Sequence, residues 1–333
     1  MTDLSRRRFL SLLVAGGLCA AGRFVCPPSA LAGAPGRRAV TRILPAMSTF
    51  VQVTAVHESA DAAEAAIAAA FAAVTKLEAV LTRFDPASPL SALNASGRLI
   101  DVPPALATVL SAGLAFHGAT GGAFDPTVLP LLDCLAQAAA LGRALDPADP
   151  RLAQARALVG VDAVRLGPGR AELARDGARL TLDGLAKGYI VDAASQAMTA
   201  AGVPDHLVNA GGDLLARGRR ADGRPWSVAV ENPRTDGGYP AVTVLSGAAL
   251  ATSGRYEQPG HILDPRHPLA ATATPAAQSV TVRAPTCLEA DALATALAVL
   301  PPAEGLALVD SLPGRACLYL GAGGAKLASR AWA

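Results

Sequence analysis

The sequence is poor in aromatic residues and has no strong excess of either charge. Phe, Trp and Tyr make up 4% of the 333 residues and hydrophobic residues make up 51%, so a core must be built mainly from Ala, Val and Leu. The formal net charge is +2, from 29 basic and 27 acidic residues. This balance argues against a nucleic-acid-binding protein, which typically carries a basic face or stripe.

Several common motifs are also missing. No G-x-G-x-x-G follows an expected strand and no G-x-x-x-x-G-K-[ST] occurs, so neither common cradle for dinucleotides or triphosphates is present. Neither H-E-x-x-H nor G-x-S-x-G is present either. The three cysteines beyond residue 32 are an odd number without C-x-x-C spacing. We therefore expect Cys134, Cys287 and Cys317 to be small buried hydrophobic side chains rather than metal ligands or disulfide partners.

The first 32 residues have the pattern of an export signal. A run of arginines at 6–8 precedes an apolar stretch at 9–21, and A-L-A at 30–32 is a small-x-small cleavage site. The Arg pair followed by Phe-Leu indicates the twin-arginine route, so we expect a mature protein that works in the periplasm. An uncleaved signal that keeps the protein at the membrane is the alternative.

After a short linker at 33–38, residues 39–333 are predicted to form one α+β unit. Residues 59–81 contain no Gly or Pro, and Ile67, Phe71 and Val74 recur at helical spacing behind the capping residue Ser59. Further helices are expected at 104–120, 128–142, 149–158, 187–201, 288–300 and 303–312. Strands are expected at 39–57, 163–182, 206–209, 226–231, 242–245, 250–253, 279–283 and 316–320. The order lacks a steady βαβ rhythm, which favours layered mixed sheets with flanking helices.

Three glycine-punctuated polar clusters are candidates for a ligand site. In G-G-A-F-D-P-T at 121–127, Asp125 could face a ligand from a tight loop or simply cap a helix. In D-G-L-A-K-G at 183–188, Asp183 and Lys187 frame an expected helix start. Its backbone N–H groups would suit a phosphate; alternatively, the segment is an ordinary helix entry. In N-A-G-G-D at 209–213, the double Gly would permit close approach to a ligand or form a plain turn.

Two further clusters add a histidine and a candidate metal site. T-S-G at 252–254 is followed by H-I-L-D-P-R at 261–266, where His261 could be a general base or a structural histidine. Asp291 and Thr295 are four residues apart, so their oxygens share one face of a helix and suit a hard cation such as Mg²⁺. Asp291 could instead be a first-turn acid favoured by the helix dipole.

Taken together and in this order, the clusters resemble the ApbE family, the FAD:protein FMN transferases. The resemblance runs from M-S-T at 47–49, through residues 88–94 and the clusters above, to D-A-L-A-T at 291–295 and almost to the C-terminus. It implies an ApbE-like, T-fold-related single catalytic unit over residues 39–333. The chain departs from the family pattern in a short connection at 255–260 and in H-P-L at 267–269, both near the expected acceptor groove.

The resemblance also implies roles for individual residues. A Mg²⁺ site would use the side chains of Asp291 and Thr295 and the main-chain carbonyls of Ala186 and Ala294. His261 is our candidate for the group that handles the proton of the acceptor hydroxyl, beside Asp291 as the second catalytic position. The residues expected to line the FAD site are Met47, Phe84, Ala123, Phe124, Asp125, Asp183, Lys187 and Ile262.

The activity implied by the resemblance is Mg²⁺-dependent cleavage of FAD, which is a substrate here. The FMN half would be attached through a phosphoester bond to a Thr or Ser of an acceptor flavoprotein, and AMP would be released. The acceptor would be a periplasm-facing subunit of a membrane electron-transfer complex. If water attacks instead, the protein is an FAD pyrophosphatase that yields FMN and AMP. A non-catalytic FAD-binding protein is the remaining alternative.

Overall fold

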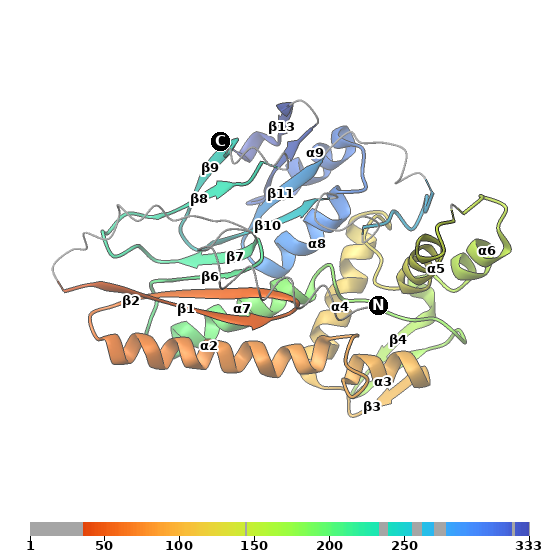
Figure 1. Ribbon diagram of the computed structural model, residues 1–333, viewed down its shortest axis with the longest axis horizontal. Helices are drawn as coiled ribbons and strands as arrows, with labels where there is room; N and C mark the ends of the chain where they lie inside the picture. Colours follow the sequence, from red (N-terminus) through yellow and green to blue (C-terminus); the bar gives the residue numbers. More distant parts are fainter. Residues whose placement is uncertain are drawn as a thin grey trace.

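The structure, a computed structural model, describes residues 36–143, 145–232, 239–254, 262–269, 278–321 and 324–332. Its largest sheet has eight antiparallel strands in the order β1-β2-β6-β7-β10-β11-β12-β13 (Figure 1). These strands are β1 (Arg38–Ala46), β2 (Thr49–His57), β6 (His206–Ala210), β7 (Asp213–Arg217), β10 (Ala248–Gly254), β11 (Ser279–Ala284), β12 (Ala316–Leu320) and β13 (Lys326–Ala328). The N-terminal hairpin β1–β2 thus pairs with strands from the second half of the chain.

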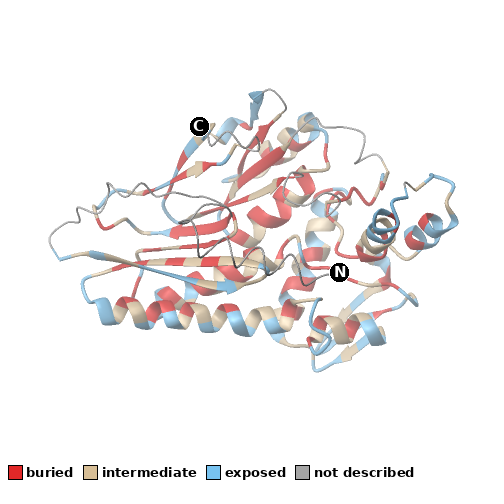
Figure 2. Ribbon diagram, in the orientation of Figure 1, coloured by how far each residue is buried: buried red, intermediate tan, exposed pale blue. Residues whose placement is uncertain are grey.

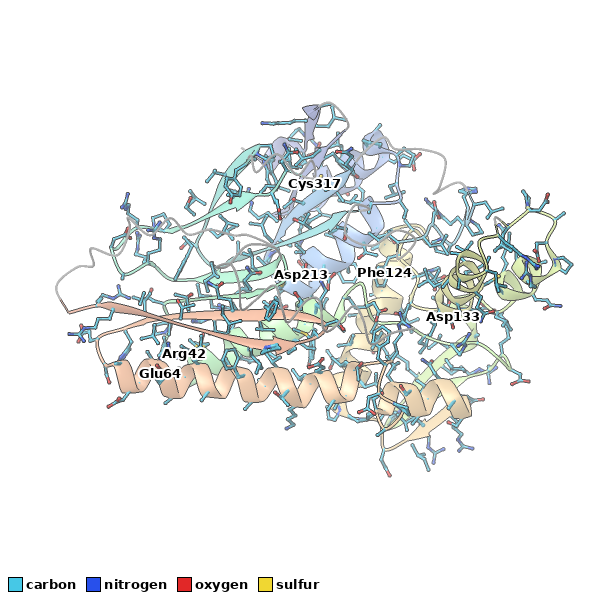
Figure 3. The ribbon with its side chains drawn as sticks, in the orientation of Figure 1. Arg42, Glu64, Phe124, Asp133, Asp213 and Cys317 are labelled. Atoms are coloured by element: carbon cyan, nitrogen blue, oxygen red, sulfur yellow. The ribbon has the colours of Figure 1, made fainter. Side chains whose placement is uncertain are left out.

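Three helices cover one side of this sheet and form the main core with it. They are α2 (Ala60–Leu81), α7 (Ala186–Ala200) and α8 (Cys287–Leu297); α2 packs on β2 and α7, and α8 packs on α7 and β10. Alanines 63, 66 and 70 of α2 are fully buried, and such small side chains allow close helix packing. Figure 2 shows α2 with buried and exposed segments in alternation, as expected for an amphipathic surface helix. Glu64 of α2 also pairs with Arg42 of β1 (Figure 3).

The middle of the chain builds a helical region beside the sheet, on the right of Figure 1. It contains α3 (Pro89–Ser96), α4 (Pro104–Ala119), α5 (Leu129–Ala140), α6 (Pro150–Ala157) and the 3₁₀ turn η2 (Val161–Ala163). A small sheet in the order β3-β5-β4 joins β3 (Arg98–Ile100), β5 (Arg170–Leu173) and β4 (Val164–Gly167). The remaining elements are α9 (Pro302–Asp310), η5 (Arg330–Trp332) and a ribbon of β8 (Trp226–Val230) and β9 (Ala241–Leu245).

The predicted α+β class is confirmed, and so are most of the predicted helices. Ser59 caps α2 as expected, because its side chain accepts a hydrogen bond of 3.2 Å from the amide of Ala62. The strand pair predicted over 163–182 ends instead at Leu173. Beyond it, Asn94 of α3 accepts from the Leu180 amide at 2.7 Å and donates to its carbonyl at 2.8 Å, so a side chain replaces strand pairing there.

The export signal predicted for residues 1–32 lies outside the described residues. Within the described part of the chain, no helix is both long and apolar enough to cross a bilayer. The cysteine prediction holds for Cys287 and Cys317, which are free and buried, whereas Cys134 is free and half-buried.

Candidate functional site

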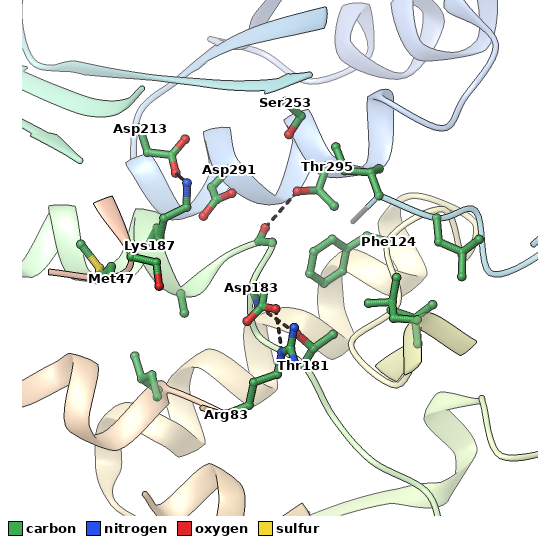
Figure 4. A pocket seen from close by; sticks show the side chains of 18 of the residues that line it. Met47, Arg83, Phe124, Thr181, Asp183, Lys187, Asp213, Ser253, Asp291 and Thr295 are labelled. Atoms are coloured by element: carbon green, nitrogen blue, oxygen red, sulfur yellow. Dashed lines mark hydrogen bonds and ion pairs between the residues drawn. The ribbon is translucent and has the colours of Figure 1, made fainter. Parts of the chain in front are cut away.

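A cleft of about 660 Å³ lies where the sheet, the α7–α8 pair and the helical region meet, a volume typical of sites for small molecules and cofactors. Its walls come from turns and helix ends that are far apart in sequence. They are the β1–β2 turn, the chain following α2, the segment leading into α5, the segment leading into α7, the β6–β7 turn, the end of β10, residues 262–265, and α8. Figure 4 shows several of the side chains that point into it.

The predicted metal pair lies together in this cleft. Asp291 and Thr295 both line it from α8. The Thr295 hydroxyl lies 3.4 Å from the carbonyl oxygen of Gly184 in the segment before α7 (Figure 4). A Cβ atom at Gly184 would lie 2.9 Å from that hydroxyl and 3.1 Å from the ring of Phe124. Glycine is therefore needed at position 184 for the backbone to approach α8 this closely.

The Asp291 carboxyl is buried among other charges. Its Oδ2 atom accepts a 3.0 Å hydrogen bond from the amide of Gly188 in α7. Burial, together with the nearby Asp213 carboxylate, raises the pKa of Asp291 well above its usual value, although the Lys187 ammonium and the Gly188 amide act in the opposite direction. Asp291 is thus no ordinary helix-dipole acid, since its carboxyl faces the cleft and α7. Any bound cation would stabilise its ionised form.

Lys187 and Asp213 form an ion pair beside Asp291. The Lys187 Nζ atom lies 2.7 Å from Oδ2 of Asp213, whose side chain is only 3% exposed (Figure 4). The sequence left open whether this helix start offers free amides to a phosphate or is an ordinary helix entry; in the structure the Ala186 amide donates to the Leu182 carbonyl and the Gly188 amide to Asp291. The Lys187 side chain lines the cleft and is 35% exposed, so its ammonium can meet an anion there.

The segment before α5 brings an aromatic ring and a carboxylate to the opposite wall. Phe124 packs edge-on against Phe116 of α4, with ring centroids 6.3 Å apart. Asp125 does not cap α5, because its Oδ1 atom accepts from the amide and hydroxyl of Thr127 at 2.7 and 2.5 Å, and α5 begins later, at Leu129. The Asp125 side chain lines the cleft, as the ligand-facing interpretation requires.

The cleft mouth is formed by the β1–β2 turn and the chain after α2. Met47 and Ser48 have positive φ angles of 53° and 58°, which make the tight turn, and the Met47 amide donates to the Glu78 carboxylate at 2.7 Å. Phe84 is 69% exposed, and the guanidinium of Arg83 lies 4.1 Å from its ring centroid. Arg83 also donates from Nε to Oδ2 of Asp183 at 2.7 Å.

The structure brings most of the predicted site together. The predicted residues that line the cleft are Met47, Phe84, Ala123, Phe124, Asp125, Asp183, Ala186, Lys187, Ile262, Asp291 and Thr295. Ala294 is fully buried in α8 beside them, with its carbonyl accepting from the Ala298 amide at 3.0 Å. His261 lies outside the described residues. Sequence reasoning gave no role to Arg83, although it adjoins Phe84, or to Asp213, although it ends the N-A-G-G-D cluster.

The donor chemistry fits a hard divalent cation. A carboxylate, a hydroxyl and main-chain carbonyls are the oxygen ligands that Mg²⁺ accepts, and it commonly keeps several waters and shares substrate phosphates. In the described part of the chain, no three His, Cys, Asp or Glu side chains are grouped to hold a metal.

Comparison with known proteins gives a consistent result. The sequence model of the ApbE family matches residues 47–319. The chain is 32% identical over 298 residues to the FAD:protein FMN transferase of Treponema pallidum, covering 80% of each chain. It is 28% identical over 257 residues to the protein of the same name from Haemophilus influenzae, covering 70% of this chain and 72% of that one.

Solved structures with the same fold match most of the chain. The apo form of the flavinyl transferase ApbE from Pseudomonas stutzeri superimposes with a TM-score of 0.77 at 29% identity, covering 88% of this chain and 95% of that one. The flavin transferase ApbE from Vibrio cholerae gives a TM-score of 0.75 at 25% identity, covering 88% and 98%.

Proposed function

The chain belongs to the ApbE family and is a transferase, and from this premise we propose that it cleaves FAD with Mg²⁺ and transfers FMN to a Thr or Ser of an acceptor protein. The observation that carries the proposal is the content of one cleft. It joins hard oxygen donors on α8, the Lys187 ammonium and the aromatic rings of Phe84 and Phe124. These are groups suited to a cation, a pyrophosphate and flat heteroaromatic rings, which together make up a metal-bound dinucleotide.

The proposed metal site uses the side chains of Asp291 and Thr295 and the carbonyls of Ala186 and Ala294. Mg²⁺ bound there would neutralise charge on the pyrophosphate and make its phosphorus atoms more electrophilic. The Lys187 ammonium would pair with a phosphate oxygen, and the buried Asp213 carboxylate 2.7 Å away holds that ammonium in place. Positioning and charge stabilisation are the main contributions a protein makes to phosphoryl transfer.

The reaction exchanges one P–O bond for another. The acceptor hydroxyl oxygen attacks the phosphorus of the FMN half in line, the bond from that phosphorus to the bridging oxygen breaks, and AMP leaves with the bridging oxygen. The hydroxyl proton passes to a base, for which His261 is our candidate. The flavin undergoes no redox change, so the aromatic side chains of the cleft need only bind and orient it.

The proposal extends to location and partner. The twin-arginine pattern at residues 5–10 supports action in the periplasm. An acceptor there would be a flavoprotein subunit of a membrane electron-transfer complex that exposes its Thr or Ser on the same side.

The deciding experiment follows AMP, free FMN and acceptor mass after incubation of the mature protein with FAD and Mg²⁺, with and without a candidate acceptor domain. AMP release with an FMN-sized mass gain on the acceptor is the expected result. AMP with free FMN and no mass gain on several acceptors would instead indicate the pyrophosphatase. Bound FAD without AMP under any condition would indicate a binding protein.

A substitution at Asp291 tests the proposed metal site. Asp291→Ala should lower Mg²⁺-dependent AMP release by more than roughly a hundredfold while the protein stays folded, since losing even a ligand's supporting group typically costs ten- to a hundredfold. Glu289→Ala is the matched control on the same helix, because Glu289 pairs with Arg315 at 2.8 Å and does not line the cleft. Unchanged activity in Asp291→Ala would refute the metal assignment.

A further inference from the structure

Arg83 connects its neighbour Phe84 with Asp183, another residue of the cleft, which lies 100 positions after Arg83 in sequence. Its guanidinium carbon lies 4.1 Å from the centroid of the Phe84 ring, within the range of a cation–π contact. Its Nε atom donates a 2.7 Å hydrogen bond to Oδ2 of Asp183, in the segment that leads into α7 (Figure 4). One planar group thus contacts both the aromatic ring that follows α2 and the carboxylate on the facing segment.

The backbone that carries Arg83 and Phe84 is held by its own hydrogen bonds. The amide of Phe84 donates to the Thr82 hydroxyl at 3.2 Å, and the Ser88 hydroxyl donates to the Thr82 carbonyl at 2.5 Å. Ser88 is itself buried and caps α3 through the Ser91 amide. The position of the Phe84 Cα atom is therefore fixed, and Arg83 restricts the remaining freedom of the side chain, the orientation of its ring.

The ring of Phe84 lines the cleft but is 69% exposed. The Arg83 guanidinium packs against one face of this ring. The Arg83 side chain itself is only 23% exposed. An exposed aromatic ring at a cleft is a surface on which a flat heteroaromatic ring gains stacking energy. The substrate proposed above contains two such rings, isoalloxazine and adenine.

We propose that Arg83 is a positioning residue that clamps Phe84 and Asp183, so that the open face of Phe84 receives a flat heteroaromatic ring of the dinucleotide. This inference rests on the proposed function and adds to it a residue that acts through its neighbours. Arginine suits this role because its planar guanidinium can stack on a ring and donate sideways to a carboxylate at the same time. Lysine carries the same charge on a compact ammonium and cannot do both.

The test measures binding without turnover. Dissociation constants for FAD, FMN and AMP are determined by calorimetry in metal-free buffer for the wild type, Arg83→Lys, Arg83→Gln and a control. The control is Arg330→Lys, because Arg330 also donates from Nε to an aspartate, Asp310, at 3.1 Å but lies outside the cleft. Both Arg83 variants should bind FAD roughly threefold to tenfold more weakly, while the control binds as the wild type does.

The separate ligands identify which ring stacks on Phe84. A parallel loss for FMN alone would assign the isoalloxazine, and one for AMP alone would assign the adenine; either result supports the clamp. Wild-type affinity of both Arg83 variants for all three ligands would overturn it and leave the proposed function standing. A wild type that binds none of the three ligands, either in metal-free buffer or with Mg²⁺ added, would overturn the proposed function and the clamp together.

A double-mutant cycle separates positioning from a general structural role. If Arg83 acts through the ring, Arg83→Gln should weaken binding less than twofold in a Phe84→Leu background, because the group that it orients is gone. Thermal unfolding of each variant checks that the fold is retained. A full threefold to tenfold effect of Arg83→Gln in the Phe84→Leu background would refute the proposed route through Phe84.

Discussion

Gly188 of α7 is packed directly against the start of α8, and we predict that Gly188→Ala destabilises the protein strongly. A Cβ atom at this position would lie 2.3 Å from the carbonyl oxygen of Cys287 and 2.7 Å from the amide nitrogen of Leu288. Both are backbone atoms, so no side-chain rotation relieves the overlap. The two helices must separate by roughly 1 Å to restore ordinary van der Waals contact.

Three effects set the size of the loss. Overpacking of this kind costs about 1–3 kcal/mol, and we expect the upper end of this range here because the added Cβ atom overlaps with backbone atoms. The separation also breaks the hydrogen bond from the Gly188 amide to Asp291, which is worth about 1 kcal/mol. Alanine regains about 1 kcal/mol over glycine within a helix. We expect the free energy of unfolding to fall by about 3 kcal/mol, a large share of the stability of a typical domain.

The assay is urea unfolding followed by circular dichroism, with Gly118→Ala as the matched control. Gly118 is also a helical glycine, in α4, but a Cβ atom there meets nothing within 4 Å. This control should gain about 0.5–1 kcal/mol, because alanine restricts the unfolded chain. A Gly188→Ala protein within 0.5 kcal/mol of the wild type or as stable as the control would refute the argument from backbone contact.

Two further predictions concern groups that hold the elements around the cleft. Burial lowers the pKa of His206, whose Nδ1 atom donates to the Val203 carbonyl at 2.8 Å. Below pH about 6.5 the unfolded chain therefore binds a proton at His206 that the folded chain does not bind. The free energy of unfolding should consequently fall as the pH drops from 7 to 5. In urea unfolding measured at several pH values, His206→Gln should reduce this dependence of the unfolding free energy on pH, whereas His57→Gln should not. An equal pH dependence in the wild type and both variants would contradict this prediction. Asp192→Ala should cost about 2 kcal/mol in the same assay, because the half-buried Asp192 carboxylate accepts from the first two amides of α8 at 2.8 and 2.9 Å. Asp149→Ala, which removes the cap of α6, should cost less than Asp192→Ala because Asp149 caps one backbone amide, that of Arg151, and equal losses for the two would contradict this reasoning.

Local patterns in the sequence were enough to place the elements that carry the site. Helical spacing put the side chains of Asp291 and Thr295 on one face, and both line the cleft. The cap at Ser59 likewise marked the start of α2 to within one residue. Such features depend on neighbours three or four positions apart, which the regular geometry of a helix brings together whatever the rest of the chain does.

Contacts between distant segments could not be predicted in this way. Nothing in the spacing of Arg83 and Asp183 indicates that they meet, and the same holds for the pairing of Lys187 with Asp213. The bonds between the Asn94 side chain and the Leu180 backbone, within the segment predicted as strand, could not be predicted either. In each case the partner is set by how separate elements pack, so a pattern within one segment carries no information about it.

Patterns in the sequence predicted the α+β class, the helices other than α3, and the residue types that could hold a cation and a dinucleotide. The folded chain was needed to show that these residues share one cleft, that the Asp291 carboxyl is buried beside Asp213, and that a Cβ atom at Gly188 would overlap the α8 backbone. This difference follows from the distance along the chain over which the interactions act. Secondary structure follows from interactions along a few residues of chain, whereas burial, charge environment and steric limits at a site arise from surfaces that meet only when the core forms.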